Sequence, residues 1–215
     1  MRKKIKTDES YYDIEVNVET LIENGMVEEL FFLKDLKQRK LFLDSDVDQY
    51  SVGGIVRHIM QINKEDKGIE VSKRQPILLY VVSNGGEVDS GFELIDAIMN
   101  SKTPVYTINL GYQYSMGFLI GIAGHKRFAS ANAKFLMHDG SNFVYGSGSK
   151  VQDQMEFQRK VEERVKKYVI SRSKITSDEY DSKLRVEWYM FADEAKEKGF
   201  VDYIIGEDCD IDDIV

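Results

Sequence analysis

The sequence contains little cysteine and little proline, and each shortage limits what the protein can be. A single cysteine, Cys209, in 215 residues excludes an intrachain disulfide framework and fits a reducing compartment, so we expect a cytoplasmic protein. The only two prolines, Pro76 and Pro104, both precede predicted strands, and we find no internal repeat and no interdomain linker. The chain is therefore predicted to form one continuous domain, long enough to bury its own hydrophobic core.

Long hydrophobic runs and an excess of positive charge are also missing. No apolar segment reaches the roughly 18 residues that a membrane span needs. Residues 2–13 are charged and polar, unlike the apolar core of a signal peptide. The net charge is −8, and we find no concentrated cluster of basic residues of the kind that binds nucleic acid. We therefore expect neither a membrane nor a nucleic acid as a partner.

Short apolar runs alternate with amphipathic segments along most of the chain. This order of strand, helix and strand predicts an α/β fold, with a parallel sheet and helices on its faces. Residues 1–30 are polar and rich in glutamate, and we expect a mobile or partner-dependent segment there, followed by a domain over 31–206 and an acidic tail over 207–215. The predicted strands are 41–43, 77–82, 105–110, 127–130, 134–137 and 201–205, and the clearest helices are 115–123 and 151–172.

Two polar residues at the ends of predicted elements suggest acyl-transfer chemistry. Ser115 lies where a helix is predicted to begin after a strand, a place that collects free N–H groups and favours an oxyanion. His138 ends a later strand and could activate the serine as a base. Taken singly, the serine could be an ordinary helix cap and the histidine a structural side chain. His58, within a predicted helix, and His125, in a turn, are weaker candidates for the base.

The Gly85-Gly86 pair follows another predicted strand and lets the backbone approach a substrate closely. Backbone N–H groups near Gly86 and Met116 could then hold the oxyanion that Ser115 creates. Alone, the glycine pair could be a simple strand-to-helix turn. Ser115, His138 and the glycine pair all occur at strand ends in one βαβ series, where parallel sheets place their ligand sites.

The sequence does not indicate a metal or nucleotide site. The run Asp44, Asp46 and Asp48 lacks the glycine and glutamate that a calcium loop requires at its sixth and twelfth positions, so helix capping is expected instead. No second histidine lies at ligand spacing from His138. The segment Tyr145–Lys150 lacks the spacing and the preceding strand of a phosphate loop. We expect no cofactor, and any ATP requirement would belong to a partner protein.

Several of these motifs, in this order, resemble the Clp protease proteolytic subunits, which are ring-forming serine peptidases with a crotonase-like fold. The resemblance extends from about Leu33 to Ile205. In that family the serine and histidine at these positions are nucleophile and base, and the second glycine and the residue after the serine donate the oxyanion-hole N–H groups. The motifs are Ser83–Val88 with Gly91, Tyr114–Gly117 with Ala123-Gly124, Met137-His138, and Phe191–Ala195 with Gly199–Asp202.

The resemblance also implies an architecture and partners. The predicted helix 151–172 would be the family's handle helix, which joins two seven-membered rings, so a homo-oligomer of seven or fourteen chains is expected. The active sites would face an internal chamber that receives unfolded polypeptides from an ATP-driven unfoldase. The expected fold is accordingly a ββα superhelix with a parallel sheet and a protruding helix.

The sequence departs from the family pattern at three positions. Asn84 stands where the family usually has proline, Glu187 aligns with the aspartate of the triad, and Val186 aligns with an arginine that contacts the other ring. We predict Glu187 as the third catalytic residue, with Asp193 and Asp202 as alternatives. The leading function is a serine endopeptidase. A catalytically silent ring subunit and a crotonase-type acyl-CoA enzyme remain as alternatives.

Overall fold

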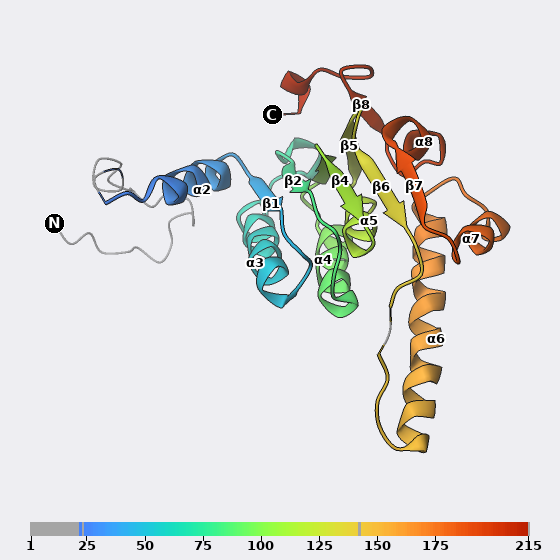
Figure 1. Cartoon of the computed structure of the whole chain (residues 1–215). Coiled ribbons are helices and arrows are strands. Elements are labelled where there is room, and N and C mark those ends of the chain that lie inside the picture. The colour runs from blue at the N-terminus through green and yellow to red at the C-terminus, as the bar shows by residue number, and fades with distance from the viewer. Residues whose placement is uncertain (1–21, 23, 142, 215) are drawn as a thin grey trace.

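The computed structural model describes residues 22, 24–141 and 143–214, which fold around two β-sheets (Figure 1). The larger sheet is entirely parallel, with the strand order β1-β2-β3-β5-β8, as the βαβ pattern predicted. The smaller sheet has the order β4-β6-β7, and its last strand is antiparallel. The strands are β1 Lys40–Leu43, β2 Ile77–Val81, β3 Val105–Asn109, β4 Tyr112–Tyr114, β5 Lys126–Ser130, β6 Lys134–Met137, β7 Trp188–Phe191 and β8 Tyr203–Ile205.

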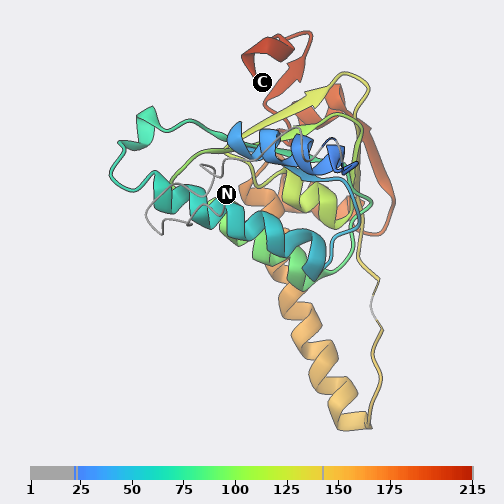
Figure 2. The same cartoon turned by 90° about the vertical axis from the view of Figure 1, so that its left-hand side faces the viewer.

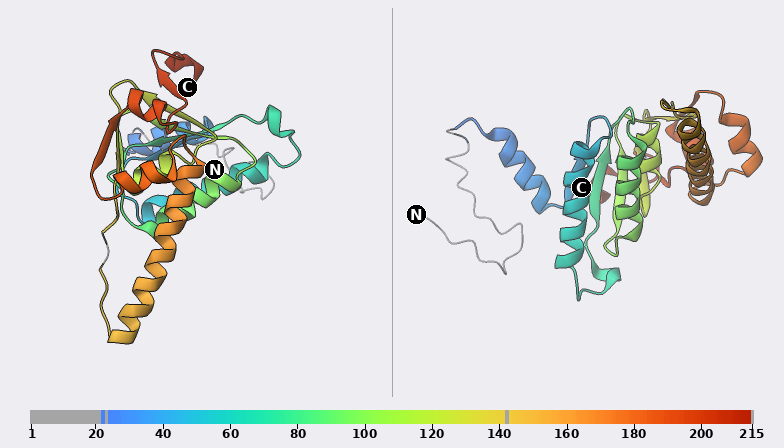
Figure 3. Two further views of the ribbon diagram at one scale, coloured as in Figure 1. Left: turned by 90° about the vertical axis from the view of Figure 1, so that its right-hand side faces the viewer. Right: turned by 90° about the horizontal axis from the view of Figure 1, so that it is seen from below.

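Helices cover one face of the larger sheet, where α3, α4 and α5 lie in a row (Figure 3). Alternate residues of β2 point to opposite faces, so Leu79 joins the main core beneath these helices while Leu78 joins a smaller cluster on the other face. The helices are α2 Val27–Lys37, α3 Gln49–Glu65, α4 Val88–Asn100, α5 Met116–Gly121, α6 Gly148–Ser171, α7 Ser177–Lys183 and α8 Ala192–Glu197, with single 3₁₀ turns η1 Val71–Lys73 and η2 Ile211–Asp213.

The helix that follows the aspartate run begins as predicted. The Asp48 side chain accepts hydrogen bonds from the N–H groups of Tyr50 and Ser51, each at 2.8 Å. The Ser51 hydroxyl in turn accepts from the Asp48 N–H at 3.0 Å, which completes a capping box. These bonds lower the pKa of Asp48 despite some desolvation. The aspartate run therefore serves to start α3.

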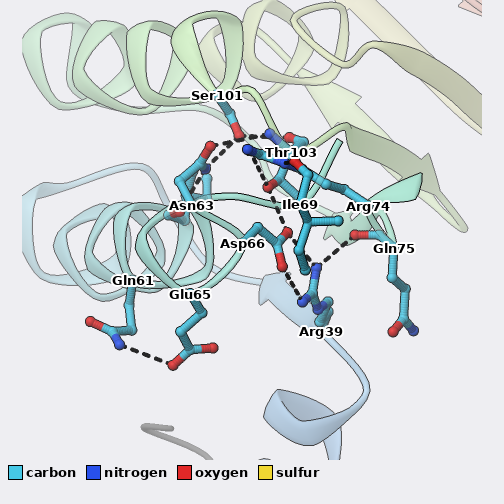
Figure 4. Close-up of polar contacts among 11 residues, drawn as sticks. Arg39, Gln61, Asn63, Glu65, Asp66, Ile69, Arg74, Gln75, Ser101 and Thr103 are labelled. Carbon is cyan, nitrogen blue, oxygen red and sulfur yellow. Dashed lines mark hydrogen bonds and ion pairs between the residues drawn. The ribbon is translucent and has the colours of Figure 1, made fainter. Parts of the chain in front are cut away.

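A buried ion pair ties the entrance of β1 to the loops before β2 and β3 (Figure 4). Asp66 is 1% exposed and accepts two hydrogen bonds from Arg39, at 2.7 and 2.8 Å, and one from the Thr103 hydroxyl at 2.7 Å. Beside it, the amide of Asn63 accepts from the N–H groups of Lys102 and Thr103. Burial alone would raise the pKa of Asp66, but the bonds from Arg39 and Thr103 outweigh it and hold the pKa below its usual range.

Helix α6 stands away from both sheets and, with the described residues just before it, forms an arm (Figures 1 and 2). It begins at Gly148, about one turn before the predicted start. Only its last turns are anchored, because Tyr168 and Val169 are its buried residues and the Tyr168 hydroxyl donates to the Leu119 carbonyl at 2.8 Å. Val165 also packs against the core and Lys166 pairs with Asp181 of α7, so the contacts described for α6 lie near its C-terminal end.

The two ends of the chain differ from the simplest expectation. Helix α2 spans residue 30, where the sequence placed the start of the domain. Residues 1–21 and 23, most of the predicted N-terminal segment, lie outside the described residues. In the acidic tail, η2 brings Ile214 against Leu78, Ile108 and Phe128, and Ile214 is only 7% exposed.

Candidate active site

The smaller sheet places Ser115 and His138 at the same edge. Strands β4 and β6 are parallel, with Tyr114 opposite Leu136. Ser115 directly follows β4, and its N–H donates to the Leu136 carbonyl at 3.0 Å. His138 follows β6 directly. Two residues far apart in sequence are thus brought to adjacent strand ends, as predicted for a ligand site of parallel strands.

The third strand brings Glu187 to His138. Strands β6 and β7 are antiparallel with Met137 opposite Trp188, so the next pair in the register is His138 and Glu187. Their side chains meet, with Nδ1 of His138 3.0 Å from Oε1 of Glu187. An ionised carboxylate accepts hydrogen bonds but cannot donate them. We therefore assign the proton to Nδ1, which leaves Nε2 as the basic nitrogen. The side chain of His138 is 24% exposed and that of Glu187 is 57% exposed.

Neither alternative acid occupies this position. Asp202 is committed to Arg127, from which it accepts hydrogen bonds at 2.6 and 2.9 Å. Asp193 lies in the first turn of α8, where its side chain accepts from the Glu194 N–H at 2.9 Å. Among the described residues, neither aspartate hydrogen-bonds to His138. The geometry therefore favours Glu187 as the acid that would orient the histidine.

The backbone of Ser115 is in an unusual conformation. Its φ of 53° and ψ of −120° lie outside the regions that ordinary residues favour. Such a conformation costs on the order of 1–3 kcal/mol and occurs where surrounding structure enforces it, often at active sites. Here Ser115 forms the sharp corner between β4 and α5 and is half-buried. Within the described residues no hydrogen bond joins its hydroxyl to His138, a contact that commonly tightens only with substrate bound.

The glycine pair packs directly against this corner. Gly85 has a φ of 100°, and a Cβ on it would lie 2.7 Å from the Cβ of Ser115. Gly86 has a φ of 149°, and a Cβ on it would lie 2.2 Å from the Val47 carbonyl oxygen. No larger side chain fits either position without displacing backbone. The pair therefore brings the β2–α4 turn into contact with the serine.

Two backbone N–H groups are candidates to receive an oxyanion. Val47 donates to the Gly85 carbonyl and accepts from the Glu87 N–H, both at 2.8 Å, so the intervening Gly86 N–H points away from Val47. The Met116 N–H belongs to the first turn of α5, where helix donors lack an intrahelical acceptor. Neither N–H is hydrogen-bonded within the described part of the chain. Both belong to residues adjoining the Ser115 corner.

Buried side chains fix the position of these donors. The Met116 side chain, 2% exposed, packs against Gly91 of α4, where a Cβ would lie 2.3 Å from the methionine Cγ. Ser83, 1% exposed, accepts from the Gly85 N–H at 3.1 Å. Asn84, between Ser83 and Gly85, is exposed, so its replacement of the usual proline is accommodated at the surface.

The other two histidines have structural surroundings. His125 Nδ1 accepts from the Val105 N–H at 3.1 Å, and burial lowers the pKa of His125. His58 contacts the ring of Phe32 edge-on, and its pKa is lowered by burial and then by the charge of Arg57. Neither lies in the smaller sheet that carries His138.

Within residues 22, 24–141 and 143–214, no three histidine, cysteine or acidic side chains are grouped as metal ligands would be. Tyr145–Lys150 leads into α6 at the tip of the arm and follows no strand directly. None of the described helices is both long and apolar enough to span a membrane.

Two of the three strands that build this site were not predicted. Strand β4 has only three residues, too few for a periodicity to be recognised, and β7 has four. The signal that could have found them is their aromatic content, Tyr112 and Tyr114 in β4 and three aromatic residues in Trp188–Phe191, which is typical of strands. Without them the relation between Glu187 and His138 could not be derived from periodicity.

Comparison with known proteins agrees with the resemblance in the sequence. The Clp protease family model matches residues 23–208. The ATP-dependent Clp protease proteolytic subunit 2 of Treponema pallidum is 29% identical over 186 residues, covering 86% of this chain and 90% of the relative. The ATP-dependent Clp protease proteolytic subunit 1 of Streptomyces avermitilis is 31% identical over 175 residues, covering 79% and 76%. The chain therefore belongs to the Clp protease family.

Proposed function

We propose that the protein is a serine endopeptidase in which Ser115, His138 and Glu187 act as nucleophile, base and orienting acid. The observation that carries this proposal is the 3.0 Å contact between His138 Nδ1 and Glu187. His138 follows β6, which is the neighbour of β4, and Ser115 follows β4. With Nδ1 held by Glu187, Nε2 is the nitrogen that would take the proton that the serine must lose. Membership of a protease family supports the same chemistry.

The reaction would proceed through an acyl-enzyme. Ser115 Oγ attacks the carbonyl carbon of the scissile peptide bond while His138 Nε2 takes its proton. The N–H groups of Gly86 and Met116 stabilise the oxyanion of the tetrahedral intermediate. His138 then gives the proton to the departing amine, and a water molecule, activated by the same nitrogen, hydrolyses the acyl-enzyme. Glu187 stabilises the transient imidazolium and remains ionised throughout.

The arm supports a proposal about assembly. Four large side chains on it, Phe143, Tyr145, Met155 and Phe157, are between 50% and 92% exposed. Exposed apolar surface on a projecting arm is typical of an interaction site. We propose that it pairs with the arm of a second copy, joining rings of seven chains into a closed chamber. A chamber admits only unfolded polypeptides, so the substrate would be delivered by a separate ATP-dependent unfoldase. The single cysteine fits a cytoplasmic location for this system.

A fluorophosphonate probe tests the catalytic proposal directly. The wild-type chain should be labelled on Ser115 and should cleave a short fluorogenic peptide. Ser115→Ala should abolish both, with a loss of at least ~10⁴-fold in peptide hydrolysis. His138→Ala should abolish labelling while Ser115 is still present.

The same experiment distinguishes an active peptidase from the alternative, a catalytically silent ring subunit. Such a subunit would assemble to the same solution mass as an active one but would not react with the probe. Hydrolysis by Ser115→Ala within about ten-fold of wild type would contradict the assignment of the nucleophile.

A further inference from the structure

One face of the smaller sheet carries both His138 and a row of tyrosines. Successive residues of a strand point to opposite faces, and in β7 Trp188 and Met190 are buried whereas Tyr189 and Phe191 are exposed. Tyr189 is therefore on the same face as Glu187, two residues before it. Across the antiparallel pair Tyr189 lies opposite Leu136, two residues before His138.

Aromatic contacts fix the ring of Tyr189. It meets Tyr114 edge-to-face, with ring centroids 6.0 Å apart and an interplanar angle of 89°. Tyr114 in turn contacts Tyr112, with centroids 5.1 Å apart. Leu136 lies on β6, between the strand of Tyr114 and the strand of Tyr189. It is only 6% exposed, although it lies on the same face of the sheet as these tyrosines. The two rings therefore cover Leu136 and are held by it.

Glu187 itself has little to hold it. Its side chain is 57% exposed, and it is one methylene longer than the aspartate that the family usually has at this position. A long exposed side chain samples many rotamers, of which few place a carboxylate oxygen against His138. The triad needs a second contact if the histidine is to be oriented most of the time.

The phenol of Tyr189 is the group that can provide that contact, because it lies on the same face two residues from Glu187. The pKa of Tyr189 is raised first by partial desolvation and then by the negative charge of Glu187. The direction fits a phenol that donates its proton to an ionised acid. A carboxylate can accept two or more hydrogen bonds, so Glu187 has the capacity to accept from the phenol while it accepts from His138 Nδ1.

We propose that Tyr189 is a positioning residue, which donates its hydroxyl to Glu187 and keeps that side chain turned toward His138. This inference rests on the proposed peptidase function, because it assigns Tyr189 a role within the same triad. It explains how an exposed glutamate can replace an aspartate whose shorter side chain has fewer rotamers. Tyr189 acts through Glu187 and need not touch the substrate.

The test is a double-mutant cycle on peptide hydrolysis. Tyr189→Phe removes the hydroxyl and keeps the ring contact with Tyr114. We expect kcat to fall by about 5- to 10-fold, the factor that one ordinary hydrogen bond is worth, with KM unchanged. In the Glu187→Gln background the same change should alter kcat by less than about two-fold, because there is no carboxylate left to hold. Tyr112→Phe, which loses the same hydroxyl at the other end of the tyrosine row, should leave kcat within about two-fold of wild type.

Two outcomes would overturn the role of Tyr189. One is a Tyr189→Phe enzyme with wild-type kcat, and the other is an equal loss in the presence and absence of the Glu187 carboxylate. A crystallographic measurement separates this failure from failure of the peptidase proposal. In the Ser115→Ala background, Glu187 should occupy one rotamer against His138, and adding Tyr189→Phe should spread it over several. A single unchanged rotamer would refute the inference whether or not the protein cleaves peptides.

Discussion

Replacing Glu187 by glutamine removes the negative charge that faces His138 and keeps the side-chain length. In a buried triad, loss of this charge lowers kcat by roughly 10⁴-fold, because the histidine adopts the wrong tautomer and the imidazolium is unsupported. Glu187 is 57% exposed, so water screens its charge and partly replaces it. Glutamine can also turn its carbonyl oxygen toward Nδ1 and preserve the tautomer. We therefore expect kcat to fall by about 10²-fold, equivalent to about 2.7 kcal/mol in activation free energy.

Glu187→Asp is the matched variant, because it keeps the charge and shortens the reach by about 1.5 Å, the length of one carbon–carbon bond. The 3.0 Å contact would lengthen unless β7 moves, and a bridging water would take its place. The expected order of kcat is wild type, then Asp at about ten-fold lower, then Gln at about a hundred-fold lower. Both variants are measured with a fluorogenic peptide after the oligomer has been shown intact by its solution mass. Wild-type kcat in Glu187→Gln, or an Asp variant slower than the Gln variant, would refute a role for the charge.

The remaining predictions concern stability and assembly. Asp66→Asn should lower the free energy of unfolding at neutral pH by about 3 kcal/mol, because it removes the buried carboxylate charge that pairs with Arg39. The exposed pair between Glu70 and Lys73 provides the control Glu70→Gln, which should leave the free energy of unfolding nearly unchanged. Since the folded-state pKa of Asp66 is lowered, its contribution is complete above the ordinary aspartate range near pH 4 and is lost as pH falls through the folded-state pKa. Urea unfolding of the wild type and of Asp66→Asn should therefore converge as the pH falls below that range, and a constant difference would contradict this. Phe157→Asp should reduce the solution mass of the oligomer, because Phe157 is 66% exposed on the arm, whereas Phe157→Leu should retain it; an unchanged mass in the Asp variant would exclude this surface from assembly.

The larger sheet could be predicted because its signals are local. The run Ile77–Val81 is almost wholly apolar, as expected for a strand that is covered on both faces. Asp48 and the apolar residues that follow at helical spacing predict the start and buried face of α3. The order of such segments then implies parallel connections. These elements need no knowledge of distant contacts.

The ion pair between Arg39 and Asp66 could not be predicted from such local signals. Arg39 and Asp66 are separated by 27 positions and by the whole of α3, and each alone is an ordinary charged residue at the end of an element. Only the packed structure shows that Asp66 is buried and that Thr103 approaches it from a third segment. Burial of a charge depends on which loops meet, and periodicity carries no information about that.

The candidate site could be predicted only in part. Ser115 and His138 could be singled out because the serine begins a predicted helix and the histidine ends a predicted strand. Glu187 entered only through the resemblance, and its contact with His138 follows from the antiparallel pairing of β6 with a strand that the sequence did not reveal. The same pairing places Tyr189 on the face of the triad. A parallel neighbour would change the register, and a shift by one residue would turn both Glu187 and Tyr189 to the buried face. The orientation of β7, rather than the choice of acid alone, therefore makes a glutamate workable here.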